Sequence, residues 1–146
     1  MILSSNKFLF RFIFFLILLS CTKKSELGQN NTQFQKWKNQ KIADYEFTLT
    51  VNCFCTIETR GPHAIVVKGN KIQSVNGETY DPIKHYAVKT IDELFEVISI
   101  NLERKPFSKT LEYDSRYHFP SNIYFDISQM IADEEVGYTV SQFKPR

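Results

Sequence analysis

The sequence is poor in glycine and proline, with five residues of each in a chain of 146. Phenylalanine and tyrosine are abundant by contrast, with thirteen and seven residues. Disordered stalks have few aromatic residues and many charges, because they bury too little apolar surface to fold. The composition therefore excludes a low-complexity stalk and predicts a packed globular domain.

The motifs of several enzyme classes are also missing. There is no G-x-S-x-G turn of a serine hydrolase, no phosphate-binding glycine loop and no dinucleotide fingerprint. The scattered serine, histidine and aspartate residues define no triad. We therefore expect no nucleotide and no other cofactor, and a binding or structural role rather than catalysis.

Positive charge is not in excess outside the first twenty residues. Lys7 and Arg11 are two of the eighteen basic residues, and no acidic residue precedes Cys21, so residues 21–146 carry sixteen charges of each sign. A nucleic-acid-binding domain shows a basic excess or stripe. Residues 21–146 have the length of a single domain, and we expect that domain not to bind nucleic acid.

The N-terminal segment has the features of a secretory signal. Lys7 and Arg11 precede an apolar run from Phe12 to Leu19, which leads to Cys21. The end of this run is similar to the bacterial lipoprotein signal, which implies removal of residues 1–20, a diacylglyceryl thioether on Cys21 and acylation of the new amino terminus. The alternatives are a plain cleaved signal and an uncleaved anchor, although the run is shorter than the ~20 residues that span a bilayer.

A lipid on Cys21 predicts where the protein acts. Two or three acyl chains hold a protein on a membrane almost permanently. Residues 21–32 are mostly polar and are interpreted as the lipidated cysteine and a flexible tether. Thr22 stands where aspartate would indicate the inner membrane in enteric bacteria. We expect a domain anchored in the cell envelope, with the outer membrane favoured and the leaflet open.

Residues 33–146 are predicted to form one domain with two helices. Apolar residues spaced three to four apart predict the first helix over Gln33–Ala43, with Trp37 facing the core. The second helix begins at Thr90, because Thr90 and Glu93 form a capping box. It ends before Pro106.

Strands are predicted for most of the remaining domain, because apolar and polar residues alternate there. The candidates are residues 45–55, 63–68, 71–75, 109–114, 122–127 and 136–143. The pair Gly69-Asn70 predicts a tight hairpin between the second and third strands. The order αβββαβββ predicts an α+β fold, with a single antiparallel sheet of about six strands and two helices packed on one face.

The pair Cys53-Phe54-Cys55 is the most suggestive chemical feature. With Cys21 carrying lipid, these two thiols have only each other to oxidise in an oxidising compartment. Residues two apart on a regular strand lie near the upper limit of Cα separation for a disulfide, so a bridge needs a bend at Phe54. A structural staple, a pair of core thiols, a redox site and a metal site all remain open.

Three histidines are candidates for completing a metal site with the two cysteines: His63, His85 and His118. Thiolates and imidazoles suit zinc or copper(I). The spacings typical of such sites, C-x-x-C and H-E-x-x-H, are absent. Solvated or turn histidines are therefore the favoured alternative.

Four carboxylates lie close together in the sequence: Asp126, Asp133, Glu134 and Glu135. Such oxygens bind hard cations such as calcium, and Asp126 with Glu134 could also serve a hydrolase as acid and base. The alternating acidic loop of calcium sites is absent. This absence favours solvated turn carboxylates.

A set of short elements follows a fixed order over residues 37–143. Its members are Trp37, Tyr45-Glu46-Phe47, Cys53-Phe54-Cys55, Thr90 to Phe95, Tyr113-Asp114, Pro120, Ile123, Asp126, Asp133-Glu134-Glu135 and Tyr138. This set resembles a family of secreted and lipid-anchored bacterial proteins, number six-one-seven-four in the domain-of-unknown-function series. The resemblance implies an extracytoplasmic α+β domain with a C-x-C pair and a carboxylate-rich end, and it implies no reaction. Where the family has a turn glycine this chain has His118, and histidine adopts positive φ more readily than most residues.

These observations favour a lipid-anchored envelope protein that binds or supports another envelope component. Four aromatic residues predicted in loops could anchor such a partner or be buried: Tyr80, Tyr86, Tyr117 and Phe119. An exposed sheet edge is another possible contact. The alternative is a thiol redox or metal-binding module centred on Cys53 and Cys55.

Overall fold

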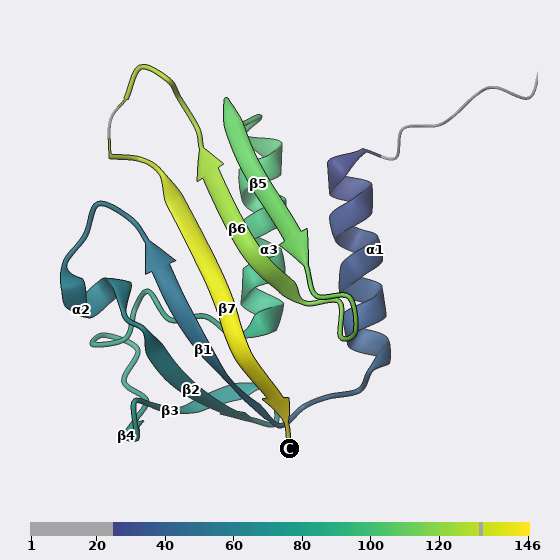
Figure 1. The fold of residues 1–146 in the computed structure, drawn as a ribbon, viewed down its shortest axis with the longest axis vertical. Helices are drawn as coiled ribbons and strands as arrows, with labels where there is room; N and C mark the ends of the chain where they lie inside the picture. Colours follow the sequence, from purple (N-terminus) through teal and green to yellow (C-terminus); the bar gives the residue numbers. More distant parts are fainter. Residues whose placement is uncertain (1–24, 132) are drawn as a thin grey trace, which may run out of the picture.

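Seven strands form one antiparallel sheet in the computed structural model, which describes residues 25–131 and 133–146 (Figure 1). The bounds are β1 Tyr45–Asn52, β2 His63–Lys68, β3 Lys71–Val75, β4 Glu78–Thr79, β5 Ser108–Tyr113, β6 Pro120–Asp126 and β7 Val136–Pro145. The strands lie in the order β4-β3-β2-β1-β7-β6-β5. The predicted α+β class and the single antiparallel sheet are confirmed. The additional strand, β4, has two residues, which is too short for alternation to reveal it.

β1 is the central strand of this sheet, and its apolar residues alternate with polar ones. Tyr45, Phe47, Leu49 and Val51 are buried, and the residues between them face the more exposed side. β1 pairs with β2 on one side and with β7 on the other. The first four strands form one antiparallel meander, β1-β2-β3-β4, and the last three form another, β5-β6-β7. The two meanders are joined by the pairing of β1 with β7.

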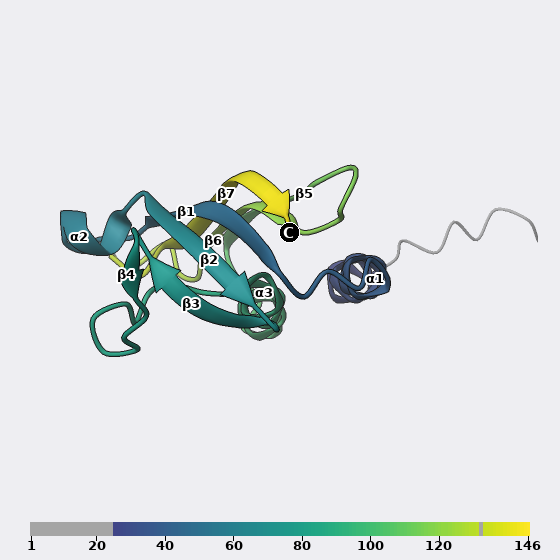
Figure 2. The ribbon, with the colours of Figure 1, turned by 90° about the horizontal axis from the view of Figure 1, so that it is seen from below.

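Helices α1 (Glu26–Asn39), α2 (Ile57–Arg60) and α3 (Ile91–Glu103) complete the described fold. Figure 2 shows α3 against one face of the sheet and α1 beside it. The predicted capping box is present at α3: Glu93 Oε2 accepts a hydrogen bond from Thr90 N at 2.6 Å, and Thr90 Oγ1 accepts one from Glu93 N. Within the described part of the chain, no helix is both long and apolar enough to cross a bilayer.

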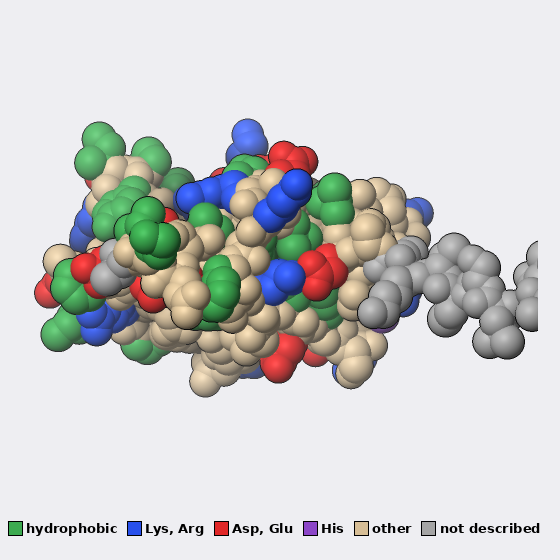
Figure 3. All heavy atoms as spheres, turned by 90° about the horizontal axis from the view of Figure 1, so that it is seen from above, with side chains coloured by type: hydrophobic (Ala, Val, Ile, Leu, Met, Phe, Trp, Pro, Cys, Tyr) green, Lys and Arg blue, Asp and Glu red, His purple; other side chains and the backbone are tan. Residues whose placement is uncertain are grey.

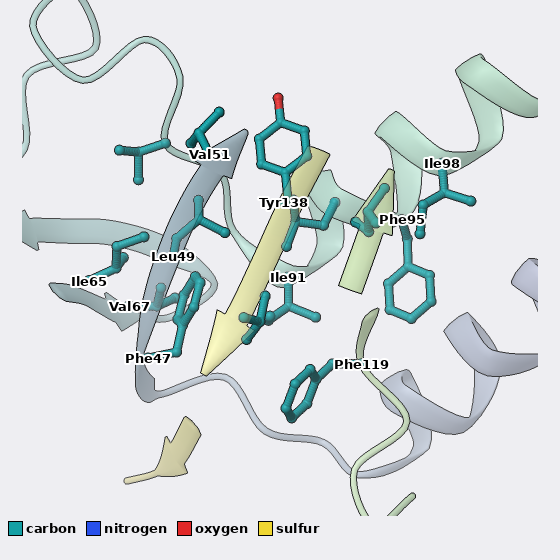
Figure 4. Close-up of a cluster of buried hydrophobic side chains, with 14 of the residues drawn as sticks. Phe47, Leu49, Val51, Ile65, Val67, Ile91, Phe95, Ile98, Phe119 and Tyr138 are labelled. Atoms are coloured by element: carbon teal, nitrogen blue, oxygen red, sulfur yellow. The ribbon is translucent and has the colours of Figure 1, made fainter. Parts of the chain in front are cut away.

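The hydrophobic core lies between α3 and the covered face of the sheet. Figure 4 shows Ile91, Phe95 and Ile98 of α3 in one cluster with Phe47 and Leu49 of β1. All five side chains are at most 2% exposed. Apolar burial on this scale contributes ~1.5–3 kcal/mol for each large side chain, so the α3 contact is a main source of stability.

α1 differs from the predicted first helix: it begins at Glu26 instead of Gln33 and ends at Asn39 instead of Ala43. The early start was missed because the core-facing residue in this stretch is polar. Asn30 is 1% exposed, and its amide donates a hydrogen bond to the carbonyl of Phe95 at 3.2 Å. The part of the predicted tether from Glu26 onward is therefore helical. The predicted signal peptide and Cys21 lie outside the described residues.

Asp114 holds the turn between β5 and β6. Asp114 Oδ1 accepts hydrogen bonds from the backbone amides of Arg116 and Tyr117. His118 has a φ of 67°. Histidine therefore adopts the left-handed conformation at the position where the resembling family has glycine.

The sheet has two distinct ends. At one end β1 finishes at Asn52, opposite Gly137 of β7, and β6 finishes at Asp126, opposite Ser108 of β5. This end is uppermost in Figure 1. We name it the disulfide end, and we define it by its loops, residues 53–56, 104–107, 127–131 and 133–135. The turn of the β2–β3 hairpin lies at the opposite end.

Candidate functional site

A disulfide joins Cys53 to Cys55 immediately after β1. The strand ends at Asn52, and the chain bends through the two cysteines, so their Cα atoms lie 5.3 Å apart. This separation is within the usual range for a disulfide, whereas a straight strand would place the two Cα atoms at ~6.6 Å. The bend expected at Phe54 is present.

The disulfide closes a three-residue loop that exposes its middle residue. The Phe54 side chain is 78% exposed, although the cysteines on either side are partly buried. Phe54 falls on the outward-facing phase of the alternation in β1, which is the sequence signal for its exposure. Because the cross-link restricts the backbone on both sides, the loop holds an apolar side chain in solvent.

A hollow of about 310 Å³ lies beside this loop. Its lining consists of Asn52, Cys53, Phe54, Tyr124, Asp133 and Glu135. Burial, followed by the negative charges of Glu135 and Asp126, raises the pKa of Tyr124. The charged groups in the lining are thus carboxylates, and nearby negative charge disfavours a thiolate. Among the residues that the structure describes, the lining holds no lysine, arginine or histidine that would stabilise a thiolate at Cys53.

Three other large apolar side chains are exposed at the disulfide end. They are Phe107, 61% exposed, Met130, 94% exposed, and Ile131, 57% exposed. Together with Phe54 they come from three separate loops, which the strand register brings to one end of the sheet. Figure 3 looks down on this end and shows hydrophobic side chains in separate groups, with charged and polar atoms between them.

The sequence analysis identified none of these four exposed side chains, although the alternation in β1 carries the signal for Phe54. Phe107, Met130 and Ile131 lie in loops whose exposure depends on tertiary packing. The aromatic residues predicted in loops differ in exposure. Tyr86 is 61% exposed, whereas Phe119 is 4% exposed and belongs to the core. Only Tyr86 of these two could contact a partner.

The predicted carboxylates lie around the same end. Asp126 ends β6, and Asp133, Glu134 and Glu135 precede β7. Asp133 and Glu135 line the hollow beside Phe54. Among residues 25–131 and 133–146, no three histidine, cysteine, aspartate or glutamate side chains are arranged to hold a metal ion. The four carboxylates therefore do not form a cation site in the described structure.

The three histidines are not assembled with the cysteines. His63 is buried at the start of β2, where its Nε2 lies 3.0 Å from the carbonyl oxygen of Thr59. His85 accepts a hydrogen bond at Nδ1 from the Asp81 amide, 3.1 Å away. His118 lies in the β5–β6 turn, away from the disulfide end. With the two sulfurs bonded to each other, neither is free to bind metal as a thiolate.

His63 and His85 do share a second hollow, of about 290 Å³. Glu58 and Glu78 also line it. Glu78 is paired with Lys84, and hydrogen bonding to that lysine lowers the pKa of the Glu78 carboxyl. A surface ion pair of this kind contributes little to stability, and it gives the hollow charges of both signs.

The fold and the site define a class of protein: an α+β domain whose single antiparallel sheet carries a disulfide-closed apolar loop at one end. The model of a family of unknown function (DUF6174) matches residues 29–145, and the chain belongs to that family. This match confirms the resemblance found in the sequence, and it extends from α1 to the end of β7. No curated protein and no solved structure matches the chain.

Proposed function

We propose that the protein is a lipid-anchored domain of the bacterial cell envelope, which acts by binding at the disulfide end rather than by catalysis. The observation that carries this proposal is the exposure of Phe54, Phe107, Met130 and Ile131 on three loops of one sheet end. The four side chains stand on separate loops, but all of these loops lie at the same end of the sheet, which makes this end the candidate contact surface. The N-terminal sequence supports the anchor, through Cys21.

The disulfide supports this function by limiting the motion of Phe54. A binding side chain that is already ordered loses less conformational entropy when its partner arrives. The cross-link between Cys53 and Cys55 supplies that order in a loop that lies beyond the hydrogen-bonded part of β1. It also suits an extracytoplasmic location, where disulfides persist.

A thiol redox module is the rival function. In that case the Cys53–Cys55 disulfide would take two electrons and two protons from a substrate dithiol, leaving two thiols in the protein and a disulfide in the substrate. Asp133 and Glu135 beside Cys53 oppose this role, because they disfavour the thiolate that must form.

Intact-mass measurement on protein purified from its own membranes tests the proposal. The expected mass begins at Cys21 with a diacylglyceryl group and an amide-linked acyl chain. It gains two alkyl groups only if the protein is reduced before alkylation. The matched variant Cys21→Ser should lose the lipid and leave the membrane fraction. An unmodified Cys21, or a protein that stays in the cytosol, would contradict the proposal.

A further inference from the structure

We infer that the component bound by the disulfide end is the lipid bilayer that carries the anchor. In this arrangement Phe54, Phe107, Met130 and Ile131 enter the interfacial layer, and the domain rests on the membrane instead of moving freely above it. The inference rests on the proposed function, because it requires a lipid on Cys21.

The described chain begins at the disulfide end. β5 starts at Ser108 on this end of the sheet, and Lys109 Nζ pairs with Glu26 Oε2 at 3.0 Å. Glu26 is the first residue of α1. The start of α1 is therefore beside the start of β5, and Figure 1 shows both toward the same end as the β6–β7 loop.

The chain between the anchor and the domain is short. Three residues lie between Cys21 and Ser25, and the four Cα-to-Cα steps of a fully extended chain span at most ~14 Å. Because Ser25 caps α1 at the disulfide end, an acylated Cys21 would keep that end close to the bilayer. The opposite end, with the β2–β3 hairpin, would face away from the membrane.

The distribution of the apolar side chains favours lipid over a protein partner. A protein interface is built around a contiguous buried centre from which a polar rim excludes water. Phe54 follows β1 and Phe107 precedes β5, with β7 and β6 between these strands, and the hydrophobic side chains seen at this end form several groups with charged and other atoms between them (Figure 3). A fluid interfacial layer accepts such side chains singly and keeps the charged groups between them hydrated.

The charges at this end are mixed. Arg104 and Lys105 lie in the loop before β5, and Asp133 and Glu135 lie in the loop before β7. Anionic lipid would therefore attract one loop and repel another. We expect seating on a zwitterionic bilayer, driven by apolar burial and by the anchor.

The single tryptophan of the chain makes this testable in the acylated full-length product. Trp37 is 2% exposed in α1 and provides a constant background. Phe54→Trp adds a second tryptophan in the disulfide loop, and the protein is reconstituted in phosphatidylcholine vesicles with and without brominated acyl chains. Because an interfacial side chain lies ~5–10 Å into the headgroup and acyl boundary, we expect bromine to quench about half of the added emission.

Lys71→Trp is the matched control, because Lys71 is exposed beside the β2–β3 turn at the opposite end. Its added emission should be unchanged by brominated lipid. Met130→Trp gives a second reading from another loop, so that a folding defect in one variant does not decide the outcome. We expect it to be quenched like Phe54→Trp.

Equal quenching in Phe54→Trp, Met130→Trp and Lys71→Trp would overturn the inference. The inference would also be overturned if the emission of Phe54→Trp were unchanged by brominated lipid and changed only when an envelope protein is added. The partner would then be a protein. The intact mass of the same sample separates the two proposals. An acylated protein without quenching contradicts only the seating, whereas a protein without acylation contradicts the anchor whatever the fluorescence shows.

Discussion

The phenolic hydroxyl of Tyr113 in β5 donates a hydrogen bond to Oδ1 of Asn30 in α1, 3.0 Å away. The Asn30 amide in turn donates to the carbonyl of Phe95 at 3.2 Å and to the hydroxyl of Ser99 at 2.9 Å, both on α3. One buried polar side chain thus joins both long helices to the sheet. Its hydrogen bonds replace the water that Asn30 loses on burial.

We expect Asn30→Ala to lower the free energy of unfolding by about 2–3 kcal/mol, because it leaves the Tyr113 hydroxyl without its acceptor and opens a cavity. Urea unfolding followed by circular dichroism measures the change. The neighbouring Asn31 is exposed, and Asn31→Ala should stay within about 0.5 kcal/mol of the wild type. Similar losses in both variants would show that Asn30 does not have the linking role assigned to it.

Tyr113 also predicts a loss of stability at alkaline pH. Burial raises the pKa of Tyr113 to about 12, above the ordinary tyrosine value of about 10. Because the folded state retains the phenolic proton more tightly, its stabilisation is complete below pH 10 and is lost as the pH rises from 10 toward 12. Tyr113→Phe should therefore show a shallower decline of melting temperature across this window.

The decline should not vanish in Tyr113→Phe, since burial also raises the pKa values of Tyr45 and Tyr138. Melting temperatures measured between pH 9 and pH 12 test this prediction, because this window includes both the ordinary tyrosine pKa of about 10 and the raised value of Tyr113. Parallel declines for the wild type and the variant would contradict the assigned role of Tyr113.

Elements governed by local patterns were predicted from the sequence. The alternation of β1, the capping box at Thr90 and the Gly69-Asn70 hairpin each depend on residues close together in the chain. These local signals agree with the tertiary contacts of the same residues, as expected when local preference and packing favour one structure. The prediction of where α1 begins was wrong, because Asn30 is buried through contacts with residues distant in the sequence.

The candidate site was predicted only in part for the same reason. The spacing of Cys53 and Cys55 indicated that a bridge would need a bend at Phe54, and it left core thiols, a redox site and a metal site as alternatives. The placement of Phe107 and Met130 at the same end of the sheet as the disulfide loop depends on the pairing of β5, β6 and β7, which local sequence patterns do not reveal. The histidines were candidate ligands from residue type alone, with solvated or turn positions favoured. The fold keeps them away from the two cysteines, and it buries His63 and His85.

We expect Gly137 of β7 to be required for the close approach of this strand to Ile123 of β6 and to Asn52 at the end of β1. A Cβ atom at this position would lie 2.9 Å from the carbonyl oxygen of Ile123 and 3.2 Å from Asn52 Cβ. The backbone of β6 would have to shift to admit it. We expect Gly137→Ala to cost about 1–3 kcal/mol by chemical denaturation.

Ser141→Ala is the control for that substitution, because Ser141 is exposed on the same strand. It should change the free energy of unfolding by no more than about 0.5 kcal/mol. If Gly137→Ala were as stable as Ser141→Ala, the close approach of β6 and β7 at this end would not be as tight as described.

The double variant Cys53→Ser/Cys55→Ser separates the structural role of the disulfide from the redox role. A cross-link that closes a loop of three residues stabilises by about 1–2 kcal/mol in the chain-entropy account, so we expect a small fall in melting temperature. If the disulfide is structural, adding the two cysteine substitutions to Phe54→Trp should also weaken the quenching by brominated lipid, because the side chain at position 54 is then less ordered. A redox site predicts instead that oxidation of a model dithiol disappears at nearly unchanged stability. The acidic side chains of Asp133 and Glu135 beside Cys53 favour the first outcome, because they oppose the thiolate on which the second depends.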